Sequence, residues 1–130
     1  MNHDKEILIN NESLLLDIQD VFSAQYPFLK IEFLQTDQTC KKLRSKQIDP
    51  HTSLRQLVNV GEPRKIDINS NRTVSEISHD FQSLLGVIVR VFRKLGNFWN
   101  EISVTEGWTL ESQNSAGEFI SSEMSEKIAQ

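Results

Sequence analysis

The sequence predicts an α+β fold: a ferredoxin-like sandwich of two β-α-β repeats, with an added C-terminal hairpin strand and helix. The first observation behind this prediction is an internal repeat, because residues 6–34 and 65–93 place apolar residues in the same order at an offset of 59 positions. The matching pairs include Ile7 with Ile66, Ile9 with Ile68, Ile18 with Ile77, Phe22 with Phe81, and Phe33 with Phe92. The second observation is a hairpin pattern over residues 87–104, where two runs of β-branched and aromatic residues meet at Gly96-Asn97.

The first repeat is expected to form a strand, a helix and a second strand. Residues 6–10 are a short strand, after which Asn11 or Ser13 can cap a helix that ends before Pro27. The apolar stripe of this helix consists of Leu14, Leu15, Ile18, Val21 and Phe22. In residues 29–33, apolar side chains alternate with Lys30 and Glu32, which predicts a strand with one solvent-facing side.

The second repeat begins with a strand at residues 65–69. Thr73 and Glu76 then have the spacing of a capping box, and Gly86 can end the helix in a left-handed conformation. The inward stripe of this helix consists of Val74, Ile77, Phe81, Leu84 and Leu85.

The remaining segments complete a single domain over residues 1–120. Between the repeats we expect a loop over residues 35–46 and a short helix from Asp49 to about Asn59. A C-terminal helix over residues 109–120 follows the hairpin, with residues 121–130 as a disordered tail.

The hairpin carries the candidate binding surface. A two-residue turn at Gly96-Asn97, with Gly first as in type II′, sets Lys94 opposite Trp99 and Phe92 opposite Glu101. Alternation then gives a core face of Val87, Val89, Val91, Ile102 and Val104. The other, mixed face carries Ile88, Arg90, Phe92, Lys94, Trp99, Glu101 and Ser103. The binding residues expected on it are Arg90, Phe92, Lys94, Trp99 and Glu101.

Three coverings of this mixed face remain open. The C-terminal segment could close it through Trp108, Leu110, Phe119 and Ile120. A protein partner or a second copy could bind it, since Trp and Arg dominate protein interfaces. Single-stranded nucleic acid could stack on its rings, with Lys94 also near enough to Trp99 for a cation–π contact.

The charge distribution bears on the nucleic-acid alternative. Net charge is −4, and residues 28–65 contain eight basic against four acidic residues between acidic ends. A weak polyanion-binding candidate lies here, formed by Lys41, Lys42, Arg44 and Lys46. The chain lacks the overall basicity of nucleic-acid-binding domains, so protein binding is favoured.

The sequence contains no catalytic or metal-binding signature. One cysteine and three histidines show no metal-ligand spacing, and nucleophile-elbow, P-loop and dinucleotide-binding motifs are absent. We therefore predict no catalytic residues, no metal and no cofactor. An enzyme would require Cys40, His51 or His79 to meet carboxylates in a pocket.

Three segments resemble a family of small uncharacterised bacterial proteins: residues 26–33, residues 91–99 and residues 108–114. The resemblance covers most of residues 6–117 and implies a cytoplasmic bacterial protein, but no activity, cofactor or site. A cytoplasmic location also agrees with the acidic, polar N-terminus, the single cysteine and the lack of a long apolar run, which predicts no membrane association. Our first hypothesis is a non-enzymatic interaction or assembly module that uses the mixed face.

Overall fold

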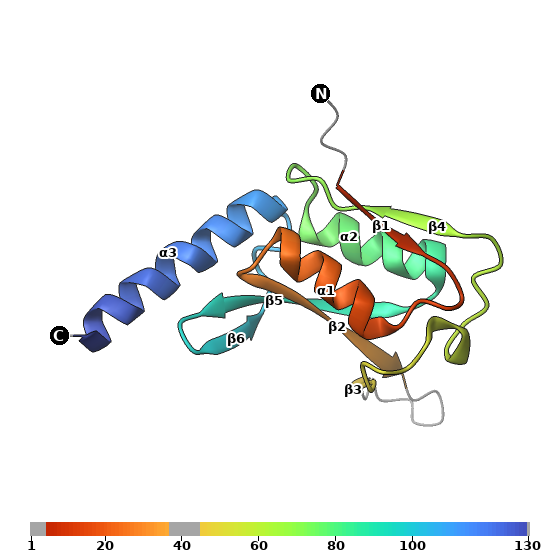
Figure 1. The fold of residues 1–130 in the computed structure, drawn as a ribbon. Helices are drawn as coiled ribbons and strands as arrows, with labels where there is room; N and C mark the ends of the chain where they lie inside the picture. Colours follow the sequence, from red (N-terminus) through yellow and green to blue (C-terminus); the bar gives the residue numbers. More distant parts are fainter. Residues whose placement is uncertain (1–4, 37–44, 130) are drawn as a thin grey trace.

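The fold is mixed α and β, as the sequence predicts (Figure 1). The computed structural model describes residues 5–36 and 45–129, with residues 35–36, 45–47 and 125–129 described by their backbone only. The strands are β1 (Glu6–Ile9), β2 (Leu29–Thr36), β3 (Ser45–Gln47), β4 (Arg64–Asp67), β5 (Ile88–Leu95) and β6 (Phe98–Glu101). The helices are α1 (Leu15–Gln25), α2 (Val74–Asp80) and α3 (Leu110–Ala129). A 3-10 turn spans Leu54–Gln56, and a π-helical turn, Phe81–Leu85, continues α2.

The strands form two antiparallel sheets instead of the one sheet that a ferredoxin-like sandwich requires. Among the described strands, β1 pairs with β4, whereas β3, β2, β5 and β6 lie in that order in a second sheet. α1 contacts β1 and β2, and α2 contacts β4 and β5. In Figure 1 the two helices lie between the β1–β4 ribbon and the four-stranded sheet. The ferredoxin-like arrangement is therefore not confirmed, because the helices separate the strands that it would join.

A single apolar core fills the space between these layers. Both strands of the β1–β4 ribbon bury alternate residues, and Ile7 lies directly opposite Ile66. The four-stranded sheet contributes Leu29, Ile31, Phe33, Val87, Val89 and Val91. Phe33 meets Phe81 edge to face with ring centroids 5.8 Å apart, which joins the sheet to the end of α2.

The two central helices begin differently. Thr73 and Glu76 form the predicted capping box at α2, and these hydrogen bonds lower the pKa of the Glu76 carboxyl. The predicted side-chain cap of α1 is wrong, because Ser13 instead accepts a hydrogen bond from the Asn10 backbone and Asn11 accepts one from the Val60 backbone. Carbonyls of the 50–52 turn accept from the first α1 amides instead.

Two further helix predictions need correction. Leu84 is exposed, not part of the core, because the π-helical turn widens the spacing and places Leu85 beneath Phe81. The expected helix up to Asn59 is only a 3-10 turn, since Asp49 forms an Asx-type turn with the His51 amide instead of capping an α-helix. Gly86 does end α2 in the left-handed conformation that we predict, with φ of 73°.

The β5–β6 hairpin has the predicted register. Lys94 lies opposite Trp99 and Phe92 opposite Glu101. Gly96 has a φ of 67°, and Asn97 does not have a positive φ. These signs agree with a type II′ turn that has Gly in its first central position. Val104, however, is 94% exposed and not in the core, because β6 ends at Glu101 and the chain turns away.

The C-terminal helix α3 is longer than predicted. It continues to Ala129, so the expected disordered tail from residue 121 is helical up to that point. Contacts with the hairpin tip hold this extension, because the Gly96 amide donates to Ser121 Oγ at 3.0 Å and Met124 lies against Gly96. Figure 1 shows α3 and the hairpin extending together from one end of the molecule.

Candidate interaction surface

The predicted binding residues lie on the side of the four-stranded sheet that faces away from the helices, which we call the outer face. Strand alternation sets its composition, since Ile31, Phe33, Val89 and Val91 point into the core. Its described residues are Lys30, Glu32 and Leu34 of β2, Ile88, Arg90, Phe92 and Lys94 of β5, and Trp99 and Glu101 of β6. All five predicted residues are thus on one surface.

Two aromatic rings and one lysine form the centre of this surface. Phe92 and Trp99 are diagonal neighbours on β5 and β6, and the Lys30 ammonium lies 5.3 Å and 4.9 Å from their ring centroids. Trp99 nevertheless keeps 38% of its surface exposed. The cation–π contact predicted between Lys94 and Trp99 is not found; Lys30 is the cation that contacts both rings.

Four of the five charged residues described on the outer face are paired within it. Arg90 Nη1 donates to Glu101 Oε1 at 3.0 Å, and Lys30 Nζ lies 3.1 Å from Glu32 Oε1. These four side chains are between 19% and 43% exposed. Such pairs are worth little for stability because water screens them. They do place positive and negative groups at defined positions on the outer face.

This surface also includes Lys30, Glu32 and Leu34, which the sequence pattern does not place on it. Alternation in β2 predicts that Lys30 and Glu32 face solvent, but it does not predict which strand lies beside them. Only the pairing of β2 with β5 brings Lys30 beside Phe92 and Glu32 beside Arg90.

The C-terminal segment does not cover the outer face, so that alternative is wrong. α3 packs on the opposite side of the sheet, where Gly117 lies against the Arg93 side chain and Phe28. Of the expected covering residues, Leu110 is fully buried in the main core, whereas Phe119 is 66% exposed. Small residues at 117 and 121 form the contact side of α3 in place of its aromatic residue.

Several sequence-predicted groups lie elsewhere. Lys41, Lys42, Arg44 and Cys40 lie outside the described residues, as does the side chain of Lys46. His51 and His79 are exposed on different elements, the turn before Leu54 and the last turn of α2. Over residues 5–36 and 45–129, the structure has no cluster of three metal-ligating side chains.

Comparison with known proteins does not assign the chain to a family. No family model, curated protein or solved structure matches the chain. Among the described residues, no helix has both the length and the apolar composition needed to cross a membrane.

Proposed function

We propose that this protein is a non-enzymatic interaction module that binds a second copy of itself through the outer face. The observation that carries the proposal is the cluster of Phe92 and Trp99 beneath Lys30, in which Trp99 is exposed, on a sheet surface that none of the described helices covers. Exposed aromatic groups among charged ones are typical of protein interfaces.

The distribution of charge favours a second copy as the partner. Among its described side chains, the outer face contains three basic residues, Lys30, Arg90 and Lys94, and two acidic residues, Glu32 and Glu101. A two-fold axis brings a surface against itself, so a patch that carries both signs can be its own complement. A partner with a large charge of one sign would meet like charges on this face.

The contacts of the cations argue against the alternative of single-stranded nucleic acid. Two of the three basic residues already have a carboxylate partner, Arg90 with Glu101 and Lys30 with Glu32, which reduces the field that a phosphate would meet. A base stacking on Phe92 or Trp99 would also have to displace the Lys30 ammonium from that ring.

Truncation of Trp99 tests the proposal. Trp99→Ala should weaken self-association at least about tenfold, because central aromatic residues contribute most to interface energy. Phe98→Ala is a matched control on the same strand, since Phe98 is 69% exposed and points to the other side of the sheet. Sedimentation velocity across a dilution series gives the dimer dissociation constant, and circular dichroism checks the monomer fold.

Three results would contradict the proposal. Equal weakening by Trp99→Ala and Phe98→Ala would place the interface elsewhere. Unfolding of the Trp99→Ala monomer would make Trp99 a residue that stabilises the fold. Retention of the chain on an immobilised oligonucleotide, lost steeply with added salt, would favour nucleic acid instead.

A further inference from the structure

Arg93 differs from the other paired arginines because its partner is neutral. It lies on β5 with its side chain on the helix side of the sheet, opposite Asn100 in the register. Arg93 Nη1 donates to Gln113 Oε1 at 3.0 Å, while its buried Nε has no hydrogen-bond partner. No carboxylate oxygen of the described residues lies within 4.0 Å of its guanidinium.

Arg72 is similar to Arg93 but has an acidic partner. Arg72 also has a buried Nε without a partner, but its Nη1 lies 2.9 Å from Asp80, which neutralises its charge. Arg93 is therefore a part-buried cation whose charge lacks a local counter-ion. Such a group is costly to desolvate, and binding an anion would offset that cost.

The surrounding residues hold the guanidinium in one place. Gln113 is fully buried, and its Nε2 donates to the Thr105 carbonyl at 2.6 Å and to Thr105 Oγ1 at 2.9 Å. These two bonds orient the Gln113 amide so that its oxygen faces Arg93. The Trp108 ring lies 6.0 Å from Arg93 Cζ, as a cation–π contact.

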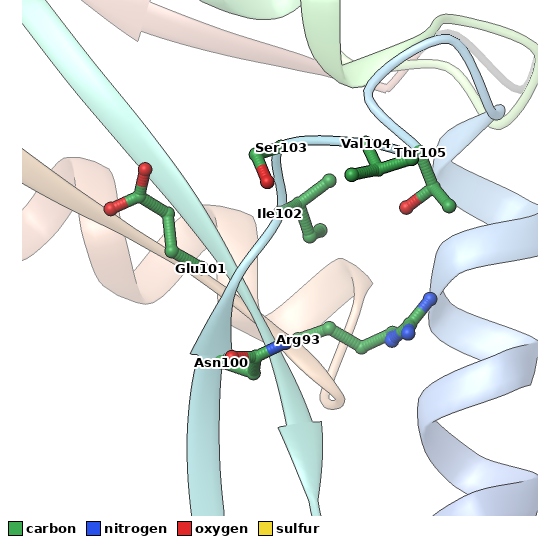
Figure 2. Close-up of a pocket in the computed structure, with 7 residues that line it drawn as sticks. All are labelled: Arg93, Asn100, Glu101, Ile102, Ser103, Val104 and Thr105. Atoms are coloured by element: carbon green, nitrogen blue, oxygen red, sulfur yellow. The ribbon is translucent and has the colours of Figure 1, made fainter.

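An open cleft lies beside this fixed cation. Its volume is about 140 Å³, and it is lined by Arg93, Asn100 and residues 101–105. Figure 2 shows the Arg93 side chain extending toward α3, with Thr105 above its guanidinium end and Ile102 between Ser103 and Arg93. Glu101 also lines the cleft, but its carboxylate points away from Arg93 and is paired with Arg90.

We propose that this cleft binds a small carboxylate, held by Arg93 together with the Asn100 amide and the Thr105 hydroxyl. A carboxylate carries one negative charge, which matches one guanidinium, and it can accept two parallel N–H bonds from it. The limited volume admits a compact anion or one acidic side chain. This site lies on the other side of the sheet from the outer face, and the inference does not depend on self-association.

The test is a ¹⁵N NMR titration at constant ionic strength with three separate probes. Sodium acetate represents a free carboxylate, N-acetylaspartate amide represents an acidic side chain, and sodium phosphate represents another anion class. We expect both carboxylates to cause saturable shifts of the amides of residues 100–105 and of Arg93 Nε. Tighter binding of acetate would indicate a free small molecule, and tighter binding of the aspartate derivative would indicate an acidic peptide.

Variants identify the residues responsible. Arg93→Gln should abolish the saturable shifts, and Arg93→Lys should weaken binding at least about fivefold because ammonium lacks the planar fork. Arg64→Gln is the charge-matched control, since Arg64 is exposed on β4 in the other sheet. If Arg93→Gln fails to fold, Asn100→Ala at an exposed position serves in its place, with weaker binding expected.

Three outcomes would overturn the inference. They are the absence of saturable shifts in the wild-type protein, shifts that persist unchanged in the folded Arg93 variants, and tighter binding of phosphate than of either carboxylate.

Discussion

Among single residues, Tyr26 makes a buried polar contact between segments that are far apart in the sequence. Its hydroxyl donates to the Ile68 carbonyl at 2.6 Å, and its ring packs on Phe22 with centroids 5.6 Å apart. This bond joins the end of α1 to the segment that follows β4. Burial, then the negative charges of Asp67 and Glu111, raise the pKa of Tyr26 from 10.0 to about 12.

We expect Tyr26→Phe to lower the free energy of unfolding by about 1 to 3 kcal/mol, because the buried Ile68 carbonyl loses its donor. The raised pKa also means that the folded state favours the neutral phenol. Its contribution is fully present below about pH 10 and is lost as the pH rises toward 12. Urea unfolding across this alkaline range measures both effects. A variant as stable as the wild type at neutral pH would contradict the first expectation.

The sequence predicts only part of the outer face. Alternation and the Gly96 turn are local signals, and they place Phe92, Trp99 and Glu101 on one face correctly. Lys30 belongs to the same cluster only because β2 pairs with β5, and these two strands are far apart in the sequence. Local patterns contain no information on which strand becomes the neighbour.

At the scale of elements, the docking of α3 depends on a close approach at one glycine. A Cβ at Gly117 would lie 2.9 Å from Phe28 Cβ, 3.1 Å from Arg93 Cγ and 3.3 Å from the Lys94 carbonyl oxygen. Alanine normally stabilises a helix interior relative to glycine by about 1 kcal/mol. Here the close contacts outweigh that preference, because two of the three neighbours are close to or part of the backbone.

We therefore expect Gly117→Ala to lower stability by about 1 to 3 kcal/mol, the usual cost of overpacking. Gly107→Ala is the control, since a Cβ there meets no atom within 4 Å, and it should change stability by less than about 1 kcal/mol. Chemical unfolding of both variants measures the difference. A Gly117→Ala protein at least as stable as the wild type would show that α3 does not pack closely on β5.

The same glycine explains why the position of α3 is not predicted from the sequence. From the sequence, apolar residues such as Trp108 and Phe119 could close the mixed face. In the structure both are exposed. The contact instead uses Gly117 and Ser121, because small residues let a helix lie close to a strand. Their spacing of four positions is a signal for close packing, but a weak one in a helix rich in serine.

At the scale of the whole molecule, all three helices lie on one side of the four-stranded sheet. α1 and α2 cover its core half, and α3 covers the part of β5 near the hairpin tip. The outer face remains the one broad surface of this sheet without a helix among the described residues. The sequence predicts the strands and helices of this arrangement individually, but not the separation of β1 and β4 into their own ribbon.

If the outer face joins two copies of the chain, as we claim, the solution mass of the wild-type protein depends on its concentration. Light scattering over a wide dilution series should show a mass of twice 15.0 kDa that falls toward 15.0 kDa as the protein is diluted. Trp99→Ala should shift this transition to higher concentration. A mass of 15.0 kDa at every concentration would contradict the claim.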